Sequence, residues 1–141
     1  MTTNRRILSG VYATIAAVAL VTTWSQNLAY LHSPGGFLTS FLQDLKVNAA
    51  ARSITVDIVL FFLAAAVFMV LEARRLGIPY VWAYIVGGML IAISVTFPLF
   101  LIARERKLAA SGAADLKAAD VILLAVFTAL AAAGVIFTCL A

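Results

Sequence analysis

Charged residues are scarce in this chain of 141 residues, since aspartate, glutamate, lysine and arginine together make up only 11% of it. A soluble domain is about a quarter charged. Hydrophobic residues make up 65% of the chain, and its mean hydropathy is +1.09. A soluble protein of this composition would expose large apolar patches and aggregate. We therefore predict that the chain is embedded in a lipid bilayer.

Cysteine and histidine are nearly absent. The single Cys139 excludes a disulfide within the chain, and together with the single His32 it is too little for a metal cluster. We expect no metal and no cofactor. The basic residues form no run interleaved with aromatic residues, so we expect no nucleic-acid partner. Spacing assigns no nucleophile, base and orienting group, so any catalytic residue is unknown and an enzyme is the less favoured expectation.

Four apolar segments are long enough to cross a hydrocarbon core of about 30 Å: 7–31, 54–71, 80–103 and 119–140. Arg5 and Arg6 ahead of the first segment resemble a signal peptide. The apolar part is longer than a usual signal-peptide core, so we expect a retained transmembrane helix. The second helix is expected to start nearer Asn48. The predicted fold is all-α, an integral membrane bundle of four transmembrane helices.

The loop between the first two segments contains FLTSFLQDLKVN. Its apolar residues recur with a helical period, with polar residues on the other side: Phe37, Leu38, Phe41, Leu42 and Leu45. The segment is too short to cross the membrane. We predict a short amphipathic interfacial helix between helices one and two. A lid over a lipid-facing cleft is the alternative.

The later connections differ in kind. Gly77 suits a helix C-cap and Pro79 the first turn of a new helix, so the second and third helices are expected to be antiparallel neighbours. Pro98 is expected to kink the third helix. Residues 1–107 are predicted to form a three-helix unit, and 108–141 a tether with a fourth helix. That helix has a stripe of small residues, Ala125, Ala129 and Ala133, suited to packing on other membrane subunits.

The stretch VNAAARSITVDIVLFF places an arginine and an aspartate where the second apolar segment begins. On a helical wheel Arg52 and Asp57 point apart, so they do not form an ion pair on one helix. Arg52 can reach the headgroups, whereas Asp57 is too short to do so. We expect Asp57 to face the bundle and to bond with the end of the first helix, at Trp24, Gln26 or Asn27.

These side chains form the best candidate polar site in the sequence, because intramembrane ionisable groups are functional candidates. The predicted interfacial cluster, with a binding or structural role, is Asn27, Asn48, Arg52, Ser53 and Asp57. A second cluster, Glu72, Arg74 and Arg75, is predicted to anchor headgroups or to bind an anion. Within it, Glu72 and Arg75 are spaced to pair along one helix.

The distribution of basic residues gives conflicting indications of the side of the membrane on which the N-terminus lies. With the N-terminus inside and four crossings, the inner side holds Arg5, Arg6, Arg74 and Arg75. The outer side then holds Lys46, Arg52, Arg104, Arg106, Lys107 and Lys117. This count opposes the positive-inside rule. We nevertheless favour an inside N-terminus, because the first helix and its flanking arginines often dominate insertion.

The first 107 residues resemble the bacterial small membrane proteins grouped as domain of unknown function 2834. The matching features are Trp24 with Asn27, Gly36 with Phe37, Ser53 with Asp57, the Glu-Ala-Arg-Arg turn from Glu72 to Arg75 followed by Leu76 and Gly77, and Phe97 to Phe100 with Arg104 and Glu105. Thr23 stands where the family pattern has proline, and the fourth helix departs from the three-helix unit. The resemblance implies a multi-pass protein of the bacterial inner membrane and assigns no activity.

Three functions remain open from the sequence. The favoured one is a non-catalytic accessory subunit of a larger membrane complex, in lipid or envelope transport. The second is an enzyme or carrier acting on lipids or isoprenoids at the outer interface, with Asp57, Arg52, Asn48 and Asn27 as its polar site. The third is a small solute or proton transporter, which a single acid and four helices support poorly.

Overall fold

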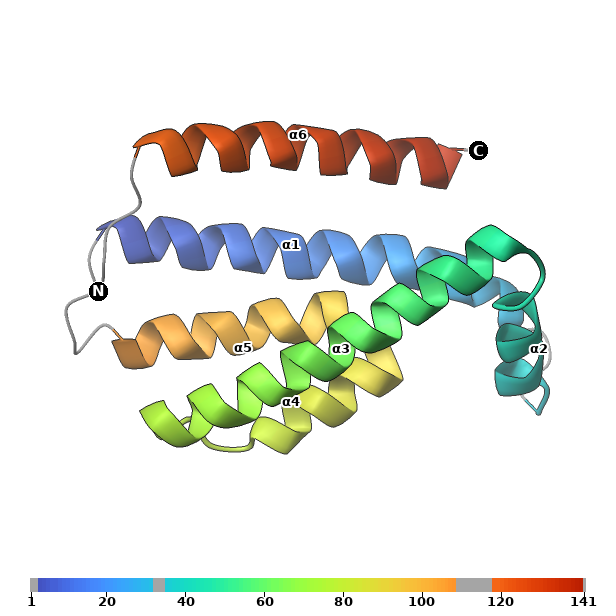
Figure 1. The fold of residues 1–141 in the computed structure, drawn as a ribbon, viewed down its shortest axis with the longest axis horizontal. Coiled ribbons are helices and arrows are strands. Elements are labelled where there is room, and N and C mark those ends of the chain that lie inside the picture. Colours follow the sequence, from blue (N-terminus) through green and yellow to red (C-terminus); the bar gives the residue numbers. More distant parts are fainter. Residues whose placement is uncertain (1–2, 32–34, 109–117, 141) are drawn as a thin grey trace.

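The computed structural model describes residues 3–31, 35–108 and 118–140, and within these ranges the chain is helical (Figure 1). The helices are α1 (Thr3–Asn27), α2 (Phe37–Asp44), α3 (Ala49–Leu76), α4 (Val81–Gly87), α5 (Ile93–Leu108) and α6 (Ala118–Leu140). By length and composition, four stretches could each cross a membrane: Arg5–Tyr30, Ala49–Leu76, Val81–Leu108 and Ala118–Cys139. The predicted all-α membrane bundle is therefore confirmed. His32 and most of the predicted tether, 109–117, lie outside the described residues.

The ends of α3 follow the local signals in the sequence. Asn48 is its N-cap, since the Asn48 side-chain oxygen accepts a hydrogen bond of 2.8 Å from the Ala51 amide. Gly77 ends the helix in the left-handed conformation with φ +65°. The Ile78 amide then donates to the Ala73 carbonyl at 3.0 Å, which closes a Schellman motif. The expected start near Asn48 and the expected C-cap at Gly77 are both confirmed.

The predicted amphipathic helix is also present, as α2. A 3₁₀ turn, Leu28–Tyr30, follows α1, and the Tyr30 ring packs edge-on against Phe37 and Phe41 of α2. The Tyr30 hydroxyl donates a hydrogen bond of 2.7 Å to the Asp44 carboxylate. These contacts fix α2 to the end of α1, across the bundle end in Figure 1.

The third apolar stretch folds back on itself. The Tyr84 ring of α4 lies 5.7 Å from the Phe100 ring of α5, although a straight helix would separate these residues by about 24 Å. A Cβ on Gly87 would lie 3.2 Å from the Thr96 Cγ2 atom, nine positions along the chain. The chain reverses at the π-helical segment Gly88–Ala92, so α4 and α5 form a helical hairpin (Figure 1).

The reversal does not occur at Pro98, and the kink expected at that residue stays a prediction. It is buried inside α5, beyond the reversal. As expected from Gly77 and Pro79, α4 runs antiparallel to α3 (Figure 1). After the reversal, α5 runs in the direction of α3 and antiparallel to α1, so it ends beside the start of α1.

The core lies between α3 and the hairpin. Met69 of α3 and Phe100 of α5 are fully buried, each with 0% of its surface exposed. Ala73, Ile78, Val81 and Ile85 complete the buried cluster around them. The Phe68 ring lies 6.4 Å from the Phe100 ring in an edge-to-face arrangement.

Helix α6 buries no side chain against the rest of the described chain. Every α6 residue whose side chain is described, from 118 to 139, is exposed. The small-residue stripe Ala125, Ala129 and Ala133 is thus accessible, and its docking on another subunit stays a prediction. The proposed boundary between 107 and 108 stays a prediction as well.

Gly88 in the hairpin is closely packed by the side chains of Thr96 and Phe62. A Cβ there would lie 3.0 Å from the Thr96 Oγ1 atom and 3.1 Å from the Phe62 Cζ atom. We expect Gly88→Leu to lower the free energy of unfolding by about 2 kcal/mol through overpacking. The measurement is the thermal unfolding midpoint of the purified protein in detergent. Gly134→Leu is the matched control, because nothing lies within 4 Å of a Cβ at Gly134. Equal midpoints for the two variants would contradict the reversal at Gly88.

Candidate functional site

The polar cluster predicted at the start of α3 is partly used for local structure. The Asn48 side chain caps α3. The Arg52 guanidinium donates a hydrogen bond of 2.9 Å to the Lys46 carbonyl in the preceding turn. Asn27 lies half-buried at the last turn of α1, while Ser53 is exposed. Asn48 and Arg52 are thus bonded to neighbouring backbone, and neither bonds to Asp57.

Asp57 does not make the contact that the sequence predicts. Its side chain is exposed, and no hydrogen bond or ion pair joins it to another described residue. The Trp24 indole nitrogen, one of the expected partners, is buried and finds no hydrogen-bond partner among the described residues. The expectation that Asp57 turns toward the end of α1 is therefore wrong. The helical wheel predicted the direction of Asp57 relative to Arg52. It did not predict which face of α3 packs against the other helices.

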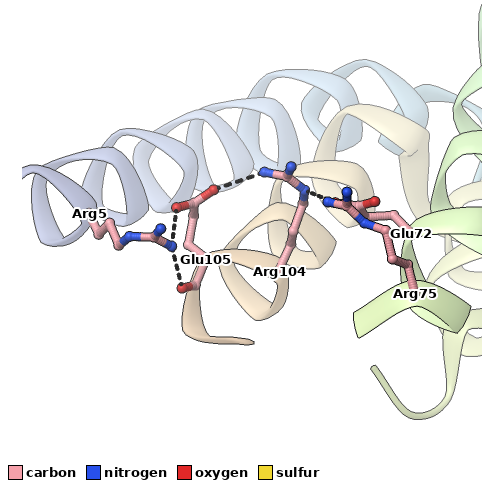
Figure 2. Close-up of polar contacts among 5 residues, drawn as sticks. All are labelled: Arg5, Glu72, Arg75, Arg104 and Glu105. Atoms are coloured by element: carbon pink, nitrogen blue, oxygen red, sulfur yellow. Dashed lines mark hydrogen bonds and ion pairs between the residues drawn. The ribbon is translucent and has the colours of Figure 1, made fainter. Parts of the chain in front are cut away.

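A network of ion pairs that the sequence analysis missed lies at the other end of the bundle (Figure 2). Glu72 on α3 accepts from Arg104 of α5 and from Arg75 of its own helix, each at 2.7 Å. Arg104 also contacts the Glu105 carboxylate at 3.1 Å. Arg5 on α1 reaches the Glu105 carboxylate and the Glu105 carbonyl, each at 3.4 Å.

The network links all three long helices of the described bundle core. Arg5, Glu72 and Glu105 are buried, with 6%, 8% and 5% of their surfaces exposed. Removing one partner from a buried pair leaves the other charge without compensation, which is costly. The pairing of Glu72 with Arg75 confirms the predicted i, i+3 contact. That this cluster anchors headgroups or an anion, as predicted for Glu72, Arg74 and Arg75, stays a prediction. Glu72 and Arg75 belong to the network, whereas Arg74 makes no bond to it.

The network also corrects the predicted distribution of charges. A single crossing by the third stretch would place Arg104 on the opposite side of the membrane from Arg5 and Glu72. The structure instead joins Arg104 to Glu72 and Glu105 to Arg5. The α4–α5 hairpin is the physical reason, because it returns the chain to the side from which it entered.

No local signal in the sequence could have revealed most of this network. Glu72 and Arg104 are 32 positions apart, and Arg5 and Glu105 are 100 positions apart. The sequence showed only that each of the five residues lies near an end of an apolar segment.

Glu72 is the carboxylate that binds two arginines, so its removal should be costly. We expect Glu72→Ala to lower the free energy of unfolding by about 3 kcal/mol, since it leaves Arg104 partly buried and without one of its carboxylates. Thermal unfolding in detergent measures this loss. Arg74→Ala is the matched control, because Arg74 is the exposed neighbour outside the network. If Arg74→Ala destabilised the protein as much as Glu72→Ala, the network would not be what holds α3 to α5.

Comparison with known proteins identifies one relationship. Residues 11–106 match the sequence model of the family described as protein of unknown function DUF2834. The matched region runs from the third turn of α1 almost to the end of α5, so it includes the hairpin and excludes α6. No curated protein and no solved structure was found to match the chain.

Proposed function

This chain belongs to the family described as protein of unknown function DUF2834, and since that description names no activity, we propose its function from its own residues. We propose that it is a non-catalytic accessory subunit of a larger bacterial membrane complex. The observation that supports this proposal is the exposed Asp57 on α3, a carboxylate without a partner among the described residues.

The depth of Asp57 follows from the length of α3. Arg52 and Glu72 are 20 positions apart, or about 30 Å along a helix, which is the thickness of the hydrocarbon core. If these two charged residues mark the boundaries, Asp57 lies about 7 Å inside the nearer one. Its neighbours Ile54, Ile58 and Phe61 are apolar and exposed. In an isolated chain, the Asp57 carboxylate would therefore face lipid.

A carboxylate facing lipid is expensive unless another group pairs with it. An aspartate at the centre of a membrane helix costs about 3 kcal/mol on insertion scales, and such residues normally pair with one another or with other polar groups. We therefore expect a partner helix that presents a lysine, an arginine or another hydrogen-bond donor at this depth. The accessible stripe Ala125, Ala129 and Ala133 on α6 supports a second contact with the same complex. A role of that complex in lipid or envelope transport stays a prediction.

An enzyme or carrier acting on lipids or isoprenoids is less well supported. That function needs Asn27, Asn48 and Arg52 to converge with Asp57 on one substrate. The Asn48 side chain is used as a helix cap, and Arg52 bonds to the Lys46 carbonyl. No described bond connects either of them to Asp57.

We further propose that the N-terminus faces the cytoplasm of a bacterial inner membrane. The hairpin and the ion-pair network gather every lysine and arginine of the described ranges at one end of the bundle, except Lys46 and Arg52. The positive-inside rule assigns the end with more basic residues to the cytoplasm. The reversal of the third stretch thus removes the conflict between the N-terminal arginines and the count of basic residues.

Labelling of single cysteines tests this orientation. In a Cys139→Ser background, we expect Lys46→Cys to react with a membrane-impermeant maleimide in intact cells. Arg74→Cys and Lys107→Cys should react only after the membrane is opened, because the hairpin brings both to the end of the bundle that we propose to be cytoplasmic. Labelling of Lys107→Cys from outside, with Arg74→Cys protected, would instead indicate a single crossing by the third stretch.

Replacement of Asp57 separates a partner contact from an internal one. We expect Asp57→Leu to remove the partner while leaving the isolated chain as stable as before or more stable, since it replaces a carboxylate that faces lipid. The native mass of the complex purified from its own membranes reports the partner, and thermal unfolding in detergent reports the stability of the chain.

Asp57→Glu is the matched control and should keep the partner, because it keeps the charge. Two outcomes would contradict the proposal. Loss of stability in Asp57→Leu would mean that the carboxylate is paired within its own chain. A native mass equal to a multiple of this chain alone would mean self-association in place of a larger complex.

A further inference from the structure

The hairpin creates a cleft that a single crossing could not form. The turn between α3 and α4, the first turn of α4 and the last turns of α5 line an open cleft of about 440 Å³. Its apolar lining includes Ile78, Ala83 and Ala103. Tyr80, Arg106 and Lys107 bring a phenol and two cations to the same cleft. The cleft lies at the end of the bundle where the ion-pair network is found.

Arg106 and Lys107 differ from the arginines of the network. Arg5, Arg75 and Arg104 are each paired with Glu72 or Glu105. Arg106 and Lys107 are exposed, and no hydrogen bond or ion pair joins either side chain to another residue in the described part of the chain. The cleft therefore carries two positive charges that the protein itself does not neutralise.

Tyr80 adds a second distinctive feature to the cleft. Its backbone is left-handed, with φ 57°, which is rare and costly for a residue with a bulky side chain. The residue is 83% exposed, and Trp82 near it in the chain is exposed as well. Exposed tyrosine and tryptophan at the end of a membrane bundle are typical of the headgroup level. These two aromatic residues support a position of the cleft at the headgroup level.

We propose that this cleft binds an anionic phospholipid, with Arg106 and Lys107 on its phosphate and the apolar lining against the start of its acyl chains. Guanidinium and ammonium groups form charge-assisted hydrogen bonds with phosphate oxygens, and their long stems reach the headgroups from a helix end. A free phosphate would use the two cations but not the lining of Ile78, Ala83 and Ala103. This site is separate from Asp57 and does not depend on the proposed partner.

Native mass spectrometry of the purified full chain, titrated with defined lipids, tests the proposal. We expect a phosphatidylglycerol molecule to bind at least tenfold more tightly than phosphatidylcholine of the same acyl chains. The double variant Arg106→Ala/Lys107→Ala should lower the affinity for phosphatidylglycerol by roughly 30-fold, as expected for two surface cations. The charge-preserving double variant Arg106→Lys/Lys107→Arg should restore most of it.

Arg6→Ala/Lys46→Ala is the matched control, since it removes two exposed cations that do not line the cleft and should leave the affinity unchanged. An equal loss of affinity in this control would mean that the effect depends on net charge alone, and it would overturn the proposed site. Equal binding of the two lipids would also overturn it. Displacement of the lipid by millimolar inorganic phosphate would assign the cations to a free anion. Asp57→Leu should keep the lipid, so failure of the lipid site and failure of the proposed function are distinguishable.

Discussion

The close approach of α4, α5 and α3 around Gly88 is the constraint on which the rest of the structure depends. Because Gly88 has no side chain, Thr96 and the Phe62 ring can pack directly on its backbone, and the chain can reverse within a few residues. The reversal returns Arg104 and Glu105 to the end of the bundle that holds Arg5 and Glu72. The buried ion pairs, the Arg106–Lys107 cleft and the one-sided distribution of basic residues all follow from it.

The carboxylates near the two ends of α3 lie in different environments. At its C-terminal end, Glu72 is buried and satisfied by two arginines. Near its N-terminal end, Asp57 is exposed and has no such partner among the described residues. Both residues lie within residues 11–106, the region that matches the family model. One carboxylate thus contributes to the fold of the chain, and the other is the one for which we propose a contact outside it.

Local signals were readable in the sequence, and distant contacts were not. The Asn48 cap, the Gly77 C-cap, the amphipathic α2 and the Glu72–Arg75 pair each depend on residues within a few positions, so pattern and spacing predicted them. A hairpin and a single crossing can have the same length and apolar composition, so the sequence predicted one membrane-spanning helix for residues 80–103. The pairs of Glu72 with Arg104 and of Arg5 with Glu105 depend on that reversal. The face of α3 that Asp57 occupies depends on packing, which periodicity alone could not supply.

The separation of Arg5 from Glu105 has a consequence for how the protein is made. Arg5 is synthesised before the carboxylate that pairs with it, which comes 100 positions later. Helix α1 has few buried residues of its own, Arg5 and Ala16 among the described ones, and its main neighbour in the fold is α5. During synthesis α1 must therefore wait in the membrane, with its arginine at the surface, until the hairpin has been inserted. The bundle of α1, α3 and the hairpin can therefore be completed only after α5, the last helix of the region that matches the family model, has been synthesised.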